Sequence, residues 1–226
     1  MERRAVIAGA TGLVGGELVK LLLSRGDYSR IIVLVRRKLE TVHERLEQLV
    51  VDYDALEELP GQLFENSDVY CTLGTTRKKA GSKEQFERVD YSYPMALGRL
   101  AKRHEAARLL IVTAMGSDES SLFFYSQVKG RVEKELQQLQ LRRLHIFRPS
   151  LILGDRQEHR WGESAAAKLY ARIPFVFGGP KSKYRPITAK EIAEGMLSTA
   201  MYGSKDDIII PSHVIAEKAE QLREQS

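Results

Sequence analysis

The sequence predicts an α/β protein built on a doubly wound parallel sheet. Short apolar runs alternate along the chain with segments whose apolar residues recur at helical spacing. The runs are apolar throughout, which is typical of strands that helices cover on both faces. The length of 226 residues suits one domain. We therefore expect a single domain over 1–226, with a cofactor-binding core in 1–150 and loops and helices over a substrate cleft in 151–226.

The expected elements alternate between strand and helix along the chain. Strands are expected over residues 5–8, 31–35, 49–51, 68–72, 109–113, 144–147 and 208–210. Helices are expected over residues 13–25, 82–104 and 126–140. Two segments have the capping-box pattern that opens a helix: Ser82 to Gln85, at the start of the second of these helices, and Thr188 to Glu191.

The composition excludes several classes of protein. Hydrophobic residues make up 43% and charged residues 29%, so the chain is neither disordered nor fibrous. Its single cysteine, Cys71, excludes an intrachain disulfide and a cysteine-built zinc site, and we expect a cytoplasmic location. No apolar run reaches the ~18–20 residues of a membrane helix. The five histidines lack metal-ligand spacing, so no metal site is expected.

A glycine-rich turn lies between the first strand and the first helix, with the sequence GATGLVG over residues 9–15. Gly9 permits a tight turn, Gly12 lets the backbone approach a pyrophosphate, and Gly15 lets the helix pack closely on the sheet. The positive end of the helix then faces the phosphates. We expect the turn to bind a dinucleotide through these glycines and through Thr11, Leu13 and Val14. The alternative is a turn with no ligand.

The end of the second strand indicates which dinucleotide is bound. NAD-binding proteins place a carboxylate there for the ribose 2′-hydroxyl, whereas this strand ends in Val35, Arg36, Arg37 and Lys38. A guanidinium pairs well with a 2′-phosphate. We therefore predict NADP(H), with Arg36 and Arg37 as ligands of the phosphate. The alternative is a solvated basic turn, and a net charge of +5 fits an anionic ligand without implying nucleic acid.

Two further strand ends are expected to contact the cofactor. Asp52 follows the third strand, where an adenine amino group would lie, although a surface carboxylate is an equal alternative. Leu73, Gly74 and Thr75 follow the fourth strand, where the backbone passes close to the sugars and phosphates of the cofactor.

The candidate catalytic pair is Tyr125 and Lys129, which follow the fifth strand at the start of a helix. Residues four apart share one helix face. An ammonium favours the phenolate form of a neighbouring phenol, which can then exchange a proton with a carbonyl or alcohol. Thr113, at the end of the fifth strand, could hold the substrate oxygen, with Ser117, Ser120 and Ser121 as competitors. For Tyr125 and Lys129, the alternative is a buried aromatic ring beside an exposed lysine without a catalytic role.

These segments together resemble the short-chain dehydrogenase/reductase superfamily, and specifically its atypical branch near the Tat-interacting-protein-like oxidoreductases. The resemblance rests on GATGLVG (9–15), VRRK (35–38), CTLGTTR (71–77), VDY (89–91), YSQVKGRV (125–132), FRPS (147–150) and DRQE (155–158).

The resemblance implies a Rossmann-type NADPH-binding domain. Tyr125 would be the proton donor or acceptor, Lys129 would bind the nicotinamide ribose, and Arg36 and Arg37 would contact the adenosine phosphate. Pro149 would also contact the cofactor. Two positions depart from the family pattern: Thr113-Ala114-Met115 replaces the usual serine-containing strand end, and Asp90 stands where many relatives carry asparagine.

The sequence therefore predicts an NADPH-dependent reductase of a small carbonyl compound. The loop over residues 156–161 is expected to face the substrate, with a surface loop as the alternative. A second hypothesis is a non-enzymatic NADPH-binding redox sensor with a protein partner, and a third, weaker one is a basic nucleic-acid binder. No membrane partner is expected.

Overall fold

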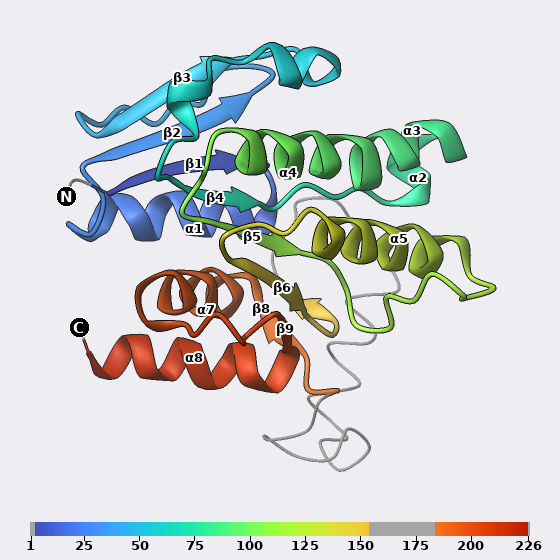
Figure 1. The fold of residues 1–226 in the computed structure, drawn as a ribbon. Helices are drawn as coiled ribbons and strands as arrows, with labels where there is room; N and C mark the ends of the chain where they lie inside the picture. The colour runs from blue at the N-terminus through green and yellow to red at the C-terminus, as the bar shows by residue number, and fades with distance from the viewer. Residues whose placement is uncertain (1–2, 154–183, 226) are drawn as a thin grey trace.

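A computed structural model describes residues 3–153 and 184–225, and its centre is a seven-stranded parallel sheet (Figure 1). The strand order is β3-β2-β1-β4-β5-β6-β9, and every neighbouring pair is parallel. The chain winds outward in one direction through β1, β2 and β3, and in the other through β4, β5, β6 and β9. This order confirms the doubly wound, Rossmann-type fold. The strands are β1 Arg4–Ala8, β2 Arg30–Val35, β3 Leu46–Val50, β4 Asp68–Cys71, β5 Arg108–Val112, β6 Leu144–Arg148 and β9 Ile209–Pro211.

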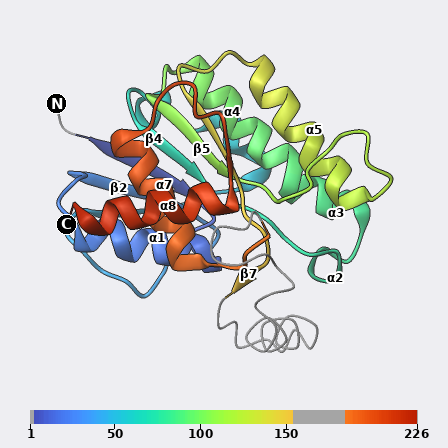
Figure 2. The same cartoon turned by 90° about the horizontal axis from the view of Figure 1, so that it is seen from below.

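Helices cover both faces of this sheet (Figures 1 and 2). One face carries α1 (Leu13–Ser24), α7 (Ala189–Tyr202) and α8 (Ser212–Glu224), and the other carries α4 (Tyr93–Arg103) and α5 (Phe124–Gln138). Alternate strand residues supply the two cores, since Ala5 and Ile7 face α1 whereas Val6 and Ala8 face α4. The strands are therefore apolar throughout because helices cover both faces of the sheet, as predicted.

The remaining elements are short. They are η1 (Tyr53–Glu58), η2 (Gly61–Leu63), α2 (Arg77–Ala80), α3 (Lys83–Glu87), the π-helical turn η3 (Arg88–Ser92) and a two-stranded pair, β7 (Ile152–Leu153) with β8 (Ile187–Thr188). Within the described residues, no helix is both long and apolar enough to cross a membrane.

Several predicted boundaries are wrong. The third strand begins at Leu46, three residues before the expected start, because as an edge strand it is only partly buried and its apolar run is short. The helix expected over 82–104 is divided into α3, η3 and α4. Helix α8 was not predicted. Thr188 and Glu191 form the predicted reciprocal capping box, and the Ser82 hydroxyl accepts a hydrogen bond from the Gln85 N–H. The loop over 156–161 and the DRQE segment lie outside the described residues.

The glycine turn packs α1 against the sheet without room for side chains. Gly9 has φ +97°, and a Cβ there would lie 2.7 Å from the Thr72 hydroxyl oxygen. A Cβ on Gly15 would lie 2.2 Å from the Gly9 carbonyl oxygen and 2.6 Å from the same hydroxyl. The Gly12 N–H donates to the Gly9 carbonyl at 2.9 Å. These contacts support the predicted roles of the first and third glycines, since any side chain would push α1 off β1 and β4.

Substituting Gly15 by alanine therefore tests the packing of this turn. We expect Gly15→Ala to lower the free energy of unfolding by about 2 to 3 kcal/mol, because the clash is with backbone. Gly16→Ala is the matched control: its Cβ would lie 3.6 Å from the Ala10 carbonyl oxygen, an ordinary contact. It should stabilise α1 by up to ~1 kcal/mol. Urea unfolding of both variants makes the measurement, and equal stabilities would contradict this account.

Candidate cofactor pocket and catalytic pair

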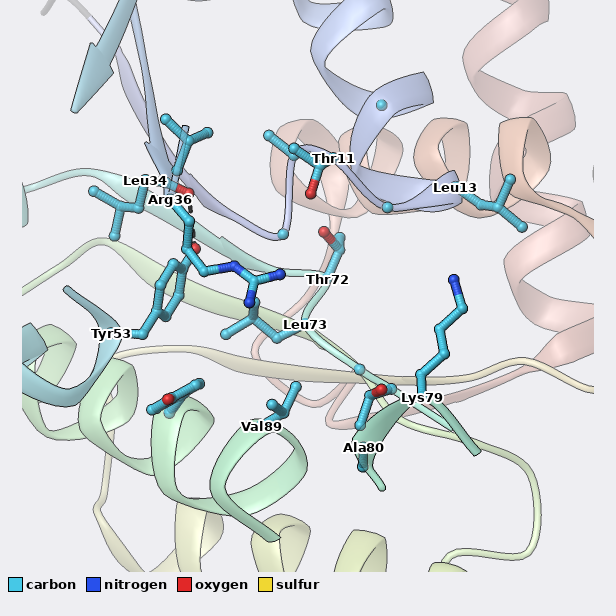
Figure 3. Close-up of a pocket in the computed structure, with 18 of the residues that line it drawn as sticks. Thr11, Leu13, Leu34, Arg36, Tyr53, Thr72, Leu73, Lys79, Ala80 and Val89 are labelled. Atoms are coloured by element: carbon cyan, nitrogen blue, oxygen red, sulfur yellow. Dashed lines mark hydrogen bonds between the residues drawn. The ribbon is translucent and has the colours of Figure 1, made fainter. Parts of the chain in front are cut away.

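A pocket of about 990 Å³ opens at the carboxyl ends of β1, β2 and β4 (Figure 3). Its walls come from the glycine turn and first turns of α1, from the end of β2, and from the segment that follows β4. Among the described residues, no side chain caps the N-terminus of α1. The pocket therefore lies at the point where the winding of the sheet reverses and where a helix offers N–H groups, which is where parallel sheets of this kind bind ligands.

Eight of the predicted cofactor contacts line this pocket. They are Gly9, Thr11, Gly12, Leu13, Arg36, Leu73, Gly74 and Thr75. The sequence positions of the glycine turn and of the strand ends thus converge on one cavity.

The other predicted contacts lie outside the lining. Val14 and Gly15 are buried, and Gly15 packs behind the turn. Arg37 is exposed. Asp52 caps η1, where its carboxylate accepts a hydrogen bond from the Asp54 N–H at 2.9 Å. The Pro149 carbonyl accepts from the Met115 N–H at 2.8 Å.

Arg36 directs its guanidinium into the pocket from the end of β2 (Figure 3). Beside it lies Tyr53, whose hydroxyl donates to the Leu34 carbonyl at 2.7 Å. Burial is the main cause that raises the pKa of the Tyr53 phenol well above its usual value, so this hydroxyl stays a neutral donor. The rings of Tyr53 and Tyr93, both lining residues, lie 5.2 Å apart between centroids. The guanidinium therefore borders an aromatic wall.

Lys79 lies at the other end of the pocket (Figure 3). It belongs to α2, which the Thr76 hydroxyl caps by accepting from the Lys79 N–H at 3.2 Å. Its ammonium extends toward Leu13, at the N-terminus of α1. Neither Tyr53 nor Lys79 was predicted, since nothing in the local sequence distinguishes a lining tyrosine or lysine from a surface one. Cationic groups at both ends suit an elongated polyanion.

Lys129 is buried and forms an ion pair with Asp90. Its Nζ lies 2.8 Å from Asp90 Oδ1, and the side chains are 4% and 1% exposed. Burial opposes the charge of Lys129, but the Asp90 carboxylate, with Tyr125 and Cys71, outweighs it and raises the pKa of the ammonium. A Cβ on Gly74 would lie 3.8 Å from this Nζ, so the ammonium lies close to a residue of the pocket lining. The sequence alternative of an exposed lysine is wrong, and Asp90 was not predicted as its partner.

Tyr125 lies one helical turn before Lys129, as the spacing predicts. Helix α5 begins at Phe124, two residues earlier than expected, so Tyr125 is in its first turn. Its ring contacts Phe86 at 5.7 Å between centroids, and 39% of the residue is exposed. The loop before it packs tightly on α5, because a Cβ on Gly130 would lie 2.1 Å from the Glu119 nitrogen. The hydroxyl-bearing side chain is thus held by aromatic packing yet reaches solvent.

The hydroxyl candidates near the end of β5 differ in their partners. Thr113 is buried, and its hydroxyl donates to the Phe147 carbonyl at 3.3 Å. Ser117 donates to the Ala114 carbonyl at 2.7 Å, and Ser120 donates to Asp118. The Ser121 hydroxyl accepts from the Phe123 N–H. Among the described residues, no group of histidine, cysteine and acidic side chains could hold a metal ion.

A family model described as HIM1 matches residues 35–171 of this chain. The chain belongs to the HIM1 family. The protein HTATIP2 of Rattus norvegicus is 40% identical over 179 residues, which cover 77% of this chain and 73% of the relative. This similarity confirms the resemblance to the Tat-interacting-protein-like oxidoreductases. The mitochondrial protein FMP52 of Candida albicans is 32% identical over 221 residues, covering 90% of this chain and 92% of the relative.

Solved structures share the fold of this HIM1-family chain. The Bordetella bronchiseptica enzyme WbmF in complex with NAD+ has a TM-score of 0.67 at 15% identity, over 97% of this chain and 78% of that one. A short chain dehydrogenase from Burkholderia cenocepacia in complex with NADP has a TM-score of 0.64 at 16% identity, over 98% of this chain and 93% of that one. At this identity the likeness shows the fold, which is that of NAD(P)-binding oxidoreductases.

The expected cytoplasmic location is contradicted by the family. Relatives from Candida albicans, Debaryomyces hansenii and Eremothecium gossypii are all named mitochondrial proteins. The expectation rested on the single cysteine, which is a weak basis: one thiol excludes an intrachain disulfide but does not distinguish one compartment from another.

Proposed function

We propose that the protein is an NADPH-dependent oxidoreductase that reduces a small carbonyl compound. The observation that carries this proposal is Arg36, which follows β2 without any carboxylate and points into the pocket beside the glycine turn. A guanidinium at this position suits a 2′-phosphate, whereas a carboxylate would suit a free 2′-hydroxyl. That a structural neighbour was solved with NADP supports the same cofactor class.

The pocket residues divide between the parts of such a cofactor. The N–H groups at the start of α1, with Lys79 opposite, suit the pyrophosphate. Arg36 suits the 2′-phosphate, with the exposed Arg37 next to it, and the aromatic wall at Tyr53 suits the adenine near Asp52. Leu73, Gly74 and Thr75 would lie along the sugars. Lys129, close to Gly74, is the proposed ligand of the nicotinamide ribose.

NADPH would supply a hydride when bound, and the proton would come from the chain. Tyr125 is the proposed donor, because a phenol at the start of α5 reaches solvent while its ring is fixed against Phe86. Lys129 would supply a fixed positive charge beside it. Thr113 is the proposed group for the substrate oxygen, after its hydroxyl turns from the Phe147 carbonyl. The exposure of Tyr125 supports an enzyme over a non-enzymatic sensor, which has no need of an accessible phenol.

The role of Arg36 is tested by reversing its charge. We expect Arg36→Asp to weaken NADPH binding by about 10- to 100-fold and to leave NADH binding nearly unchanged, because a charge-assisted contact to the 2′-phosphate is replaced by repulsion. Fluorescence titration with both dinucleotides gives the affinities. Lys38→Asp, an exposed residue outside the pocket, makes the same charge change and serves as the control. If the ratio of NADPH affinity to NADH affinity in Arg36→Asp equals that of the wild type, the assignment of NADPH is wrong.

The role of Tyr125 is tested by removing its hydroxyl. Tyr125→Phe should reduce turnover by about 10²- to 10⁴-fold while leaving NADPH affinity intact, since only proton transfer is lost. NADPH consumption against a panel of small aldehydes and ketones gives the rate. Tyr202→Phe, at the exposed end of α7, is the control. Turnover equal to that of the wild type in Tyr125→Phe would remove the proposed acid.

A further inference from the structure

The buried ion pair between Asp90 and Lys129 joins two separate parts of the fold. Asp90 belongs to the π-helical turn η3, and Lys129 belongs to α5. Their charged atoms are 2.8 Å apart and almost wholly enclosed. A buried pair of this kind gains little stability over apolar packing, because both ions lose their hydration. Stability therefore does not explain why the pair is buried here. Its place in a π-helical turn points to a functional role, because such turns often occur at functional sites.

The second oxygen of Asp90 contacts the pocket lining. Asp90 Oδ2 accepts a hydrogen bond from the Thr75 N–H at 2.8 Å. A Cβ on neighbouring Gly74 would lie 3.6 Å from Asp90 Oδ1 and 3.8 Å from Lys129 Nζ. One carboxylate thus binds the ammonium with one oxygen and accepts a hydrogen bond from the backbone of the lining residue Thr75 with the other. Asp90 therefore contacts both Lys129 and the pocket lining.

The other groups that face Lys129 do not replace this carboxylate. Cys71, on β4, is buried, and burial raises the pKa of its thiol to about 11, which leaves it neutral at physiological pH. Tyr125, one turn before Lys129 on α5, carries a hydroxyl and no carboxylate. Glu133, one turn farther along α5, is paired with Arg148 of β6. Among the described residues, Asp90 is the carboxylate within ion-pair distance of the ammonium.

We propose that Asp90 is a positioning residue of this site, which keeps the buried Lys129 charged and holds its ammonium next to the Gly74–Thr75 backbone. The benefit to dinucleotide binding rests on the proposed function, in which Lys129 binds the nicotinamide ribose. Without Asp90, the largest influence that opposes burial of the charged lysine is gone, and burial then favours its neutral form. As the pH rises, the site would then lose its positive charge at a lower pH than the wild-type site does.

The test compares NADP+ affinity at pH 6 and pH 9 in the wild type, Asp90→Asn and Lys129→Met. Asparagine retains an acceptor for the Thr75 N–H but removes the charge. We expect Asp90→Asn to bind NADP+ within about threefold of the wild-type affinity at pH 6, and about tenfold more weakly than the wild type at pH 9. Lys129→Met should bind about tenfold more weakly than the wild type at both pH values. Ratios to the wild type cancel the titration of the 2′-phosphate itself. An Asp90→Asn defect of equal size at both pH values would overturn the proposal, because a merely structural role is independent of pH.

A second measurement needs no cofactor and separates the two proposals. In Asp90→Asn the lysine binds its proton less tightly in the folded state than in the unfolded state, so the free energy of unfolding should rise from pH 7 to pH 10. The double variant Asp90→Asn/Lys129→Met lacks this titration and should not show that rise. Parallel pH profiles of the two variants would overturn the inference even if NADP+ binds. A wild type that fails to bind NADP+ while the profiles diverge would instead reject the proposed function.

Discussion

The close packing of the glycine turn is the constraint on which the rest of the structure depends. Since a Cβ on Gly15 would lie 2.2 Å from the Gly9 carbonyl oxygen, α1 can approach β1 and β4 only with glycine at these positions. That approach directs the N-terminus of α1 at the pocket and brings the segment after β4 alongside it. Helices α7 and α8 complete the core on the same face of the sheet as α1. The cavity is thus a consequence of how the first helix meets the sheet.

The inner face of α5 differs from the faces of the other described helices, because it buries two charged side chains among its apolar ones. Lys129 is paired with Asp90, and Glu133, one turn later, with Arg148. In each pair an opposite charge takes the place of the water that burial removes. Such a partner is needed for a buried charge, but the pair adds little net stability. The Lys129 pair lies close to the lining residues Gly74 and Thr75 and one turn from Tyr125, so the desolvation of its two charges occurs at the site. The fold contributes a cavity through backbone packing, and α5 contributes the charge and the phenol beside it.

Features carried by consecutive residues could be predicted from the sequence, whereas contacts between distant segments could not. Each of three features lies within a few consecutive residues: the apolar strands, the glycine turn and the basic end of β2. Their local structure could therefore be predicted, and the order of the strands then placed the turn and the basic residues in one cavity. The edge strand β3 was misplaced because its residues are only partly buried. Tyr53, Lys79 and the Asp90–Lys129 pair were missed, since only tertiary packing brings these side chains to the site.

The central claim is that this pocket binds NADPH in preference to NADH. The most direct test is a pair of titrations with NADPH and NADH on the purified wild-type protein after removal of bound nucleotide, followed by fluorescence. The account predicts saturable NADPH binding that is at least about tenfold tighter than NADH binding, because Arg36 offers a partner to the 2′-phosphate alone. Equal affinity for the two dinucleotides, or binding of neither, would contradict it.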